Sequence, residues 1–467
     1  MTKILIIAVI VMEFICFFIL ILLIIIAFIL FSDLNKKERN QIIEEYEETK
    51  EFKRTTTIVN DIASTTEKAI TILIISFMIL LSITYSFLWL SDYVRLIFGI
   101  QKSYDDQKRR AEGGNYRKMS KEGIMRKQVM TAPGKIEFED VPIPEPGENE
   151  VLIKIMRIGI CGSDIHVYHG KHPFTSYPVT QGHEVSGEIV STGSRVTGFR
   201  PGQKVTIEPQ VYCGKCYPCT HGKYNLCEEL KVMGFQTSGT ASEYFAVSAD
   251  KVTLLPDSMS FDEGAMIEPL AVTVHAVKRY TEIKGAKVAV TGAGPIGNLL
   301  AQSAKAMGAE KVVITDVSDH RLNLAKQCGV DKAYNTSQID FNDVLIDAFG
   351  PDKADVIYDC AGNNIAINQA IRCARKGSTI ILVAVFAEMA SADLAVLNDH
   401  ELDLNTSMMY RHEDYLDAIR LVQEGKVSLR PLISAHFSFE NYLDAYKYID
   451  ENREKCLKVI IDVAKEA

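Results

Sequence analysis

The sequence lacks an excess of positive charge. Its 467 residues contain 51 Lys and Arg against 60 Asp and Glu, which gives a formal net charge of -9 at pH 7. A protein that binds nucleic acid needs a basic face to neutralise phosphates. The composition therefore predicts no nucleic-acid partner, and the length suffices for roughly two or three domains.

Charge is missing altogether from one long apolar run and nearly so from another. Residues 70–90 carry no charged side chain, and residues 4–31 carry only Glu13. About 20 apolar residues are needed to cross the core of a bilayer, so both runs are long enough. The first run is too long for a signal peptide, and no A-x-A cleavage site follows it. We therefore predict a two-helix transmembrane segment within residues 1–95.

The charges around the two runs indicate an orientation. Residues 91–127 contain ten Lys or Arg against five acids, whereas the loop at 32–69 contains seven against nine. The positive-inside rule places the more basic side in the cytoplasm. We expect a protein held at the membrane through residues 4–31 and 70–90. We expect residues 96–124 to form a polar linker, and the enzyme that follows to lie in the cytoplasm.

Cysteine is not scarce, but its spacing argues against a disulfide framework. Four of the ten cysteines are Cys213, Cys216, Cys219 and Cys227, in a C-x-x-C-x-x-C pattern that is followed by seven residues and a last cysteine. Four thiolates at such spacing close a tetrahedral zinc site that has no open position. The pattern predicts a structural zinc ion in a reducing compartment.

Two kinds of secondary structure follow one another along the rest of the chain. From about residue 128, short strands separated by Pro and Gly, such as 151–156, 184–190 and 203–207, suggest an all-β barrel or sandwich. From about residue 281, strands alternate with helices, as in the apolar segments 287–290 and 311–316. That alternation predicts an α/β fold with a doubly wound parallel sheet.

A glycine-rich turn lies between the first strand and helix of the α/β region. Gly292, Gly294 and Gly297 form G-x-G-x-x-G, and Asp316 ends the following strand. In this context the glycines allow a tight turn and a close approach of the pyrophosphate of a dinucleotide. An acid at the end of the next strand binds the ribose hydroxyls and repels a 2′-phosphate, which favours NAD over NADP. The alternatives are a turn without a ligand and an aspartate that serves the turn alone.

A second set of metal ligands is spread over the chain. Cys161 lies in C-G-S-D-I-H, and His183 and Glu184 lie in G-H-E-V-S-G. One thiolate, one imidazole and one carboxylate leave the fourth position of a zinc ion open for water or substrate. By themselves, a lone cysteine and a His-Glu pair are more often structural.

The surrounding residues carry a family resemblance. Gly182, His183 and Glu184, followed by Gly187, Gly193 and Val196, match the signature of zinc-type alcohol dehydrogenases. Residues 125–463 resemble the medium-chain zinc dehydrogenases, and among them the sorbitol (L-iditol) dehydrogenase group is most similar. The resemblance implies a GroES-like β-rich catalytic domain at 125–271 and 411–467. It also implies a Rossmann NAD-binding domain at 272–410, and it leaves residues 1–124 unexplained.

The resemblance also implies roles for individual residues. Cys161, His183 and Glu184 would hold a catalytic zinc, so that each chain would carry two zinc ions. The catalytic residues expected beside it are Ser163 and His166 as a proton relay, Glu268 at the zinc or its water, and Arg411 at the substrate. Asp164 would orient the zinc histidine. The expected NAD contacts are Gly292, Gly294, Pro295, Ile296, Gly297, Asp316 and Arg321. One departure is His412, where the group has an aromatic residue next to the arginine.

These parts predict an oxidoreductase. A zinc Lewis acid lowers the pKa of an alcohol, and NAD accepts the hydride. We expect oxidation of a secondary alcohol of a polyol or sugar acid to a ketone by a homo-oligomer. The alternatives within the family are threonine and vicinal-diol (butanediol) dehydrogenases. A non-catalytic redox sensor is the alternative from another class, but the ligand set is complete.

The membrane segment has two possible origins. It is either a genuine tether that holds the enzyme near a transporter or the product of an upstream reading frame joined to a separate gene. Lys121, Glu122 and Gly123 can be encoded by a ribosome-binding sequence just upstream of the codon of Met125. The same tripeptide also occurs by chance. We expect the first strand of the enzyme to begin a few residues after Met125.

Overall fold

The computed structural model describes residues 123–386 and 388–466. The described residues belong to one compact unit. The predicted membrane runs at 4–31 and 70–90 lie outside the described residues. Within the described part, no helix has both the length and the apolarity that a membrane span needs.

The described chain begins with a β-hairpin. Strand β1 (Ile124–Ala132) pairs with β2 (Lys135–Pro142) in antiparallel register, and Ile124 faces Pro142. The first strand therefore starts one residue before Met125 and not a few residues after it, because the pairing with Pro142 extends the strand into the stretch that we assigned to the linker.

A seven-stranded sheet forms the centre of the β-rich domain. Its order is β16-β17-β3-β4-β5-β9, and β8 pairs with β3. The predicted strands at 151–156, 184–190 and 203–207 are confirmed within β3, β4 and β5. The strands are β3 (Glu150–Ile160), β4 (Glu184–Thr192), β5 (Lys204–Ile207), β8 (Tyr244–Ser248), β9 (Val252–Leu254), β16 (Ile433–Ser438) and β17 (Lys458–Asp462).

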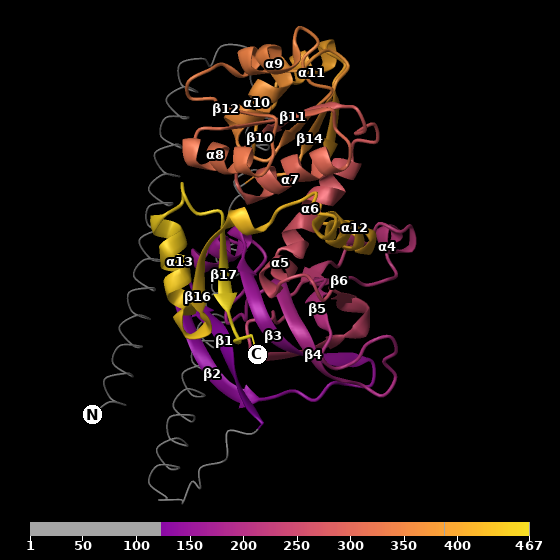
Figure 1. Cartoon of the computed structure of the whole chain (residues 1–467), viewed down its shortest axis with the longest axis vertical. Helices are drawn as coiled ribbons and strands as arrows, with labels where there is room; N and C mark the ends of the chain where they lie inside the picture. The colour runs from indigo at the N-terminus through magenta and orange to yellow at the C-terminus, as the bar shows by residue number, and fades with distance from the viewer. Residues whose placement is uncertain (1–122, 387, 467) are drawn as a thin grey trace, which may run out of the picture. The chain divides into compact units, whose positions relative to one another are not determined.

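The end of the chain completes this sheet. Strand β17 runs antiparallel to β3, with Val459 opposite Ile160 (Figure 1). Because of this pairing, Lys458 lies beside the end of β3, where Cys161 follows the strand. A residue close to the C-terminus is thereby brought to one of the two predicted metal sites.

Short elements connect the strands of the β-rich domain. They are α3 (Gly162–Tyr168), β6 (Gln210–Val211), α4 (Tyr217–Thr220), η1 (Tyr224–Leu226), β7 (Lys231–Val232), η2 (Ala249–Lys251), α5 (Phe261–Ala265), α6 (Ile267–Lys278), α12 (His412–Gln423), η3 (Arg430–Leu432), η4 (Phe439–Asn441) and α13 (Tyr442–Glu451). Helices α6 and α12 pack on each other where the chain leaves this domain and returns to it.

The second sheet is parallel and has six strands in the order β12-β11-β10-β13-β14-β15. Numbered along the chain, this is the 3-2-1-4-5-6 order of dinucleotide-binding sheets. The predicted doubly wound fold is confirmed. Its elements are β10 (Lys287–Thr291), α7 (Pro295–Ala306), β11 (Lys311–Asp316), α8 (Asp319–Gln327), β12 (Lys332–Asn335), α9 (Phe341–Phe349), β13 (Val356–Asp359), α10 (Asn364–Cys373), β14 (Thr379–Leu382), α11 (Leu394–Asp399) and β15 (Asp403–Thr406).

Both faces of this sheet are covered, which explains its nearly continuous apolar strands. Val288 and Val290 of β10 pack with helices α7 and α8 in one core cluster. Ala289, between them, faces the opposite side and packs with α9 and α10. Successive side chains of a strand point to opposite faces, so both must be apolar when helices cover both.

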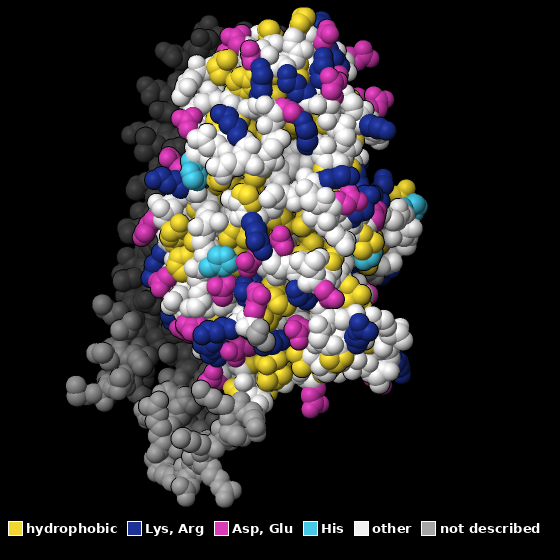
Figure 2. Space-filling view, viewed as in Figure 1, with side chains coloured by type: hydrophobic (Ala, Val, Ile, Leu, Met, Phe, Trp, Pro, Cys, Tyr) yellow, Lys and Arg dark blue, Asp and Glu magenta, His cyan; other side chains and the backbone are white. Residues whose placement is uncertain are grey.

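Charge is spread over the surface. On the face of the described residues that Figure 2 shows, basic and acidic side chains lie interspersed. Neither sign gathers into one large continuous area in that view.

Candidate metal centres and cofactor site

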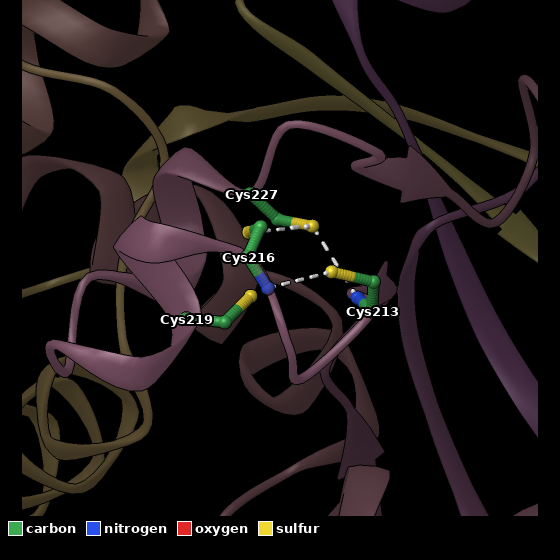
Figure 3. Close-up of side chains that lie close together, drawn as sticks. All are labelled: Cys213, Cys216, Cys219 and Cys227. Atoms are coloured by element: carbon green, nitrogen blue, oxygen red, sulfur yellow. Dashed lines mark hydrogen bonds between the residues drawn. The ribbon is translucent and has the colours of Figure 1, made fainter.

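The four cysteines of the C-x-x-C-x-x-C pattern meet at one point. Within residues 213–227, the Sγ atoms of Cys213, Cys216, Cys219 and Cys227 all lie within 4.8 Å of one another. The side chains point toward a common centre (Figure 3). The backbone N–H of Cys216 donates to the sulfur of Cys213 at 3.4 Å, and that of Glu229 donates to Cys227 at 3.3 Å. Such bonds stabilise sulfur in its anionic form.

The pKa values of these thiols differ in the way expected of groups that compete for protons. Backbone N–H groups of Glu228 and Cys219 lower the pKa of Cys216 to about 7. Desolvation, together with the neighbouring Cys216, raises the pKa of Cys219 to about 12. A cation at the centre would allow all the sulfurs to be anionic together. The donor set fits a closed tetrahedral zinc site.

The second cluster combines Cys161, His183 and Glu184, whose potential ligand atoms also lie within 4.8 Å of one another. Cys161 follows β3 and caps the N-terminus of α3. His183 and Glu184 stand at the start of β4, which pairs with β3, and Gly159 lies opposite Glu184. A side chain at Gly159 would collide with the Glu184 carboxylate, so a glycine is needed there.

Asp164 contacts two of the three residues of the second cluster. Its carboxylate accepts the N–H of Cys161 at 2.9 Å and the amide of Gln181 at 3.2 Å. It also lies 3.6 Å from Nδ1 of His183. Burial alone would lower the pKa of His183, but Asp164 and Cys161 outweigh burial and raise it well above the ordinary value. The buried imidazole therefore lies in a strongly negative environment.

A buried cation partly balances that environment. Lys458 Nζ donates to Oε1 of Glu184 at 2.7 Å, contacts Oε2 as well, and reaches the carbonyl of Ile160 at 3.2 Å. Burial alone would lower the pKa of Lys458, but Glu184 and Cys161 outweigh it and raise the pKa.

Glu268 adds a further acid to the same region. It lies in the first turn of α6 and is 6% exposed. Burial raises its pKa to about 7, and nearby Glu184 acts in the same direction while His183 opposes it. Tyr410 donates to its Oε1 at 2.6 Å.

The second cluster contains more groups that can be anionic than basic groups that can neutralise them. The groups that can be anionic are Cys161, Asp164, Glu184 and Glu268, and Lys458 is the basic side chain that contacts them. Buried negative charge in excess of its counter-charge is stable only when it is protonated or paired with a cation. A mixed set of sulfur, imidazole and carboxylate donors suits zinc. The residues therefore fit a divalent ion with an open position.

A third group, Asp262, His436 and Asp462, also brings three potential ligand atoms within 4.8 Å of one another. Arg157 Nε lies 2.9 Å from Asp262 and 3.0 Å from Asp462. The guanidinium already supplies the positive charge that a metal would bring.

The glycine-rich turn has the geometry expected of a dinucleotide site. Gly292 has φ 90°, which favours glycine. A Cβ on Gly297 would collide with the carbonyl oxygen of Gly292. Gly294 caps helix α7, which begins at Pro295 and continues with Ile296. The N-terminus of this helix is thereby free to face an anion.

Asp316 and Arg321 lie at the edge of the same turn. Asp316 accepts the N–H of Ala293 at 2.7 Å and that of Ser318 at 2.9 Å. Nη1 of Arg321 lies 3.8 Å from Asp316, and Nη2 donates to the carbonyl of Arg453 at 2.6 Å. A carboxylate oxygen has the capacity to accept more than one hydrogen bond, so Asp316 can hold the turn and still bind ribose.

Comparison with known proteins agrees with this geometry. Residues 147–257 match the alcohol dehydrogenase GroES-like domain, and residues 295–424 match the zinc-binding dehydrogenase family. A sorbitol dehydrogenase of Halalkalibacterium halodurans is 37% identical over 335 residues, which cover 70% of this chain and 96% of the relative. The chain belongs to the zinc-binding alcohol dehydrogenase family.

Two further relatives extend the likeness. L-galactonate-5-dehydrogenase of Escherichia coli is 34% identical over 71% of this chain and 97% of the relative. The crystal structure of an alcohol dehydrogenase from Escherichia coli, complexed with NADH, has a TM-score of 0.68 and 30% identity. It covers 73% of this chain and 100% of that one.

The other predicted catalytic residues of this zinc-binding dehydrogenase lie close in sequence to Cys161 or to Tyr410. Ser163 and His166 are three residues apart on α3, directly after Cys161, and His166 is exposed. Their proton relay stays a prediction. Arg411 caps α12 and is partly exposed, with its N–H bonded to Asp414 at 2.8 Å.

The residue that departs from the family pattern has a definite partner. His412 Nδ1 lies 2.6 Å from Oε1 of the buried Glu208, and Thr253 donates to the same oxygen at 2.8 Å. The imidazole is thus turned toward the β-rich domain, and about half of its surface is exposed.

Sequence reasoning missed three residues of the second cluster. Lys458 directly precedes the apolar residues 459–461 of β17, and a charge in such a place is the one signal that the sequence offered. Tyr410 gave no signal beyond its place next to Arg411. Phe235 packs against the ring of His183, with centroids 4.9 Å apart, and no pattern in the sequence indicated this contact.

Proposed function

We propose that this dehydrogenase oxidises a secondary alcohol of a polyol or sugar acid to a ketone, with NAD as the hydride acceptor. The observation that carries the proposal is the open cluster of Cys161, His183 and Glu184 beside Glu268. Relatives named sorbitol dehydrogenase and L-galactonate-5-dehydrogenase match over most of the described chain, which supports this substrate class.

Each residue set has a distinct task in this proposal. Cys161, His183 and Glu184 hold a zinc ion, and the four cysteines at 213–227 hold a second. Zinc with an open position supplies a Lewis acid that lowers the pKa of an alcohol.

The protein side chains move the proton and hold the substrate. Ser163 and His166 carry the proton from the substrate hydroxyl toward solvent, and His166 is already at the surface. Asp164 keeps the imidazole of His183 in one orientation. Arg411 contacts the hydroxyl groups of the substrate.

The cofactor is proposed to bind along the glycine-rich turn. The N-terminus of α7 would face the pyrophosphate, and Asp316 would accept hydrogen bonds from the ribose hydroxyls. An Asp316→Ser variant should use NADP better relative to NAD, which initial rates with each cofactor measure. A wild-type enzyme that prefers NADP would remove this role from Asp316.

A substrate panel tests the reaction itself. Sorbitol, xylitol, galactonate, threonine and butanediol are offered with NAD, and NADH formation is followed by absorbance. Turnover of a polyol or of galactonate, with a ketone product, supports the proposal. The observation that keeps threonine and a vicinal diol as alternatives is His412, because its imidazole stands where the family group has an aromatic side chain. Preference for one of these two would replace the proposed substrate.

Residues 1–124 carry a separate proposal, which rests on the sequence alone. Residues 4–31 and 70–90 anchor the protein in a membrane, with the enzyme on the cytoplasmic side. Extraction of membranes from cells that express the full chain tests this. A protein that alkaline carbonate releases would contradict the anchor. The homo-oligomer also stays a prediction, which light scattering of the purified enzyme checks.

A further inference from the structure

The segment at 408–412 returns the chain from the Rossmann sheet to helix α12. It is held by the four-cysteine lobe, which we define as residues 210–232. Asn225 donates to the carbonyl of Met408 at 2.9 Å, and the N–H of His412 donates to the hydroxyl of Tyr224 at 2.6 Å. If the four-cysteine lobe were misplaced, the polar groups of these two hydrogen bonds would lose their partners.

Tyr410, in the middle of this segment, has the most constrained side chain. Its carbonyl accepts the amide of Gln210 at 2.9 Å, and its side chain is completely buried. Its ring meets the ring of Tyr415 edge to face, with centroids 5.0 Å apart and an interplanar angle of 71°. The ring therefore has one position, and that position fixes where its hydroxyl points.

The hydroxyl of Tyr410 points at Glu268. It donates to Oε1 at 2.6 Å, and among the described residues it is the one side chain that hydrogen-bonds to this carboxylate. The second oxygen accepts no hydrogen bond from the described residues, and Glu268 lies close enough to Glu184 and His183 for their charges to act on its pKa. A hydrogen bond from a neutral hydroxyl to a carboxylate is short and directional.

We propose that Tyr410 is a positioning residue that sets the orientation of the Glu268 carboxylate toward the catalytic metal, and that the four-cysteine lobe holds Tyr410 in place. One carboxylate oxygen is occupied by the phenol, so Glu268 offers the other oxygen in a single direction. The inference rests on the proposed role of Cys161, His183 and Glu184 as metal ligands.

The four-cysteine lobe thereby positions a residue of the second cluster, in addition to any stability that it contributes. Its residues reach the site through three hydrogen bonds to the segment at 408–412, and the last link is the Tyr410 hydroxyl. The connection from the four-cysteine lobe to Glu268 consists of packed aromatic rings and hydrogen-bonded polar groups. It therefore affects where the Glu268 carboxylate lies and adds no charge to the site.

The test compares Tyr410→Phe with a matched control, Tyr415→Phe. Both variants remove one buried hydroxyl from the same ring pair, but the hydroxyl of Tyr415 donates to the carbonyl of Ile207 at 3.2 Å. Full-length enzyme is loaded with cobalt in place of zinc, and visible absorption reports the coordination geometry. Subtracting the spectrum of Cys161→Ala leaves the contribution of the catalytic site.

The expected result is a shifted cobalt band in Tyr410→Phe and an unchanged band in Tyr415→Phe. With the substrate that the panel identifies, kcat of Tyr410→Phe falls by about tenfold, while the KM for NAD stays the same. In a Glu268→Ala background, Tyr410→Phe changes the cobalt band no further, because the carboxylate that it orients is gone.

Two outcomes would overturn the inference. Equal band shifts in both phenylalanine variants would show a packing effect, and a shift that persists in Glu268→Ala would show that Tyr410 acts by another route. A wild-type protein without a Cys161-dependent cobalt band is different, because it would remove the proposed catalytic metal itself and the inference with it.

Discussion

The two metal clusters of this enzyme are built in opposite ways. The four cysteines lie within one stretch of fifteen residues and need only a local loop to meet. Cys161, His183 and Glu184 lie at the ends of two paired strands, and Lys458 from a strand that is distant in sequence balances part of their charge. A closed site made by one loop stabilises that loop. An open site made by several strands depends on the whole domain, and it is the site proposed to carry the chemistry.

The largest expected effect separates the clusters by activity. Cys161→Ala should lower kcat by roughly a thousandfold or more, because a Lewis acid contributes several kcal/mol to the transition state. NADH binding, followed by fluorescence, should remain. Elemental analysis should find about two zinc ions per wild-type chain and about one in this variant. If Cys161→Ala unfolds the protein as fully as a cysteine change at the other cluster, the distinction between the sites is wrong.

The next largest effect concerns the buried counter-charge of the open site. Lys458→Met should destabilise the zinc-free protein by about 3–5 kcal/mol, because it leaves Glu184 buried without a cation. Urea unfolding measures the loss. Zinc should restore part of the stability by supplying the missing positive charge. A loss that is the same with and without zinc would show that Lys458 and the metal do not share Glu184.

This contrast explains how much of the site could be predicted. The four cysteines and the glycine-rich turn were readable because their geometry is local, as at Cys213 and Gly292. Lys458 and Tyr410 were not, because each reaches the site from a distant part of the chain. The pairing of β17 with β3, and the return of the segment at 408–412, are properties of the fold. No spacing in the sequence encodes them.

The same reasoning applies to the fold. The alternation of strands and helices after residue 281 gave the doubly wound sheet, because helices on both faces demand apolar strands. The start of β1 was misplaced because a strand end is set by its partner, here Pro142, and the linker composition gave no sign of that pairing.

A smaller effect is expected when the closed cluster is damaged. Cys216→Ser should lower the melting temperature by several degrees, at about 2–4 °C per kcal/mol, and should reduce the activity far less than Cys161→Ala does. The residual loss of activity should be about tenfold or less, since the lobe acts on the site through Tyr410. Calorimetry and initial rates measure the two effects. A melting temperature equal to that of wild type would show that the four cysteines carry no structural ion.

The smallest effect concerns the contact between helices α6 and α12, which lies where the chain passes between the two domains. Asp414 is buried in α12, and its carboxylate binds His275 at 2.8 Å and Lys278 at 2.6 Å, both on α6. Burial alone would raise the pKa of Asp414, but the bonds to His275 and Lys278 outweigh it and lower the pKa. A carboxylate with a lowered pKa in the folded state contributes stability above its unfolded pKa of about 3.9. That contribution is lost as the pH falls through the pKa of the folded state.

Asp414→Asn should therefore lower the free energy of unfolding by about 1.5–3 kcal/mol at pH 7, and the difference from wild type should shrink below about pH 4. Both metal clusters also lose their ions in acid, but they do so in both proteins, so the difference between the two urea-unfolding curves isolates Asp414. A difference that stays constant from pH 7 to pH 3 would mean that the charge of Asp414 contributes nothing, and that α6 and α12 are held by apolar packing alone.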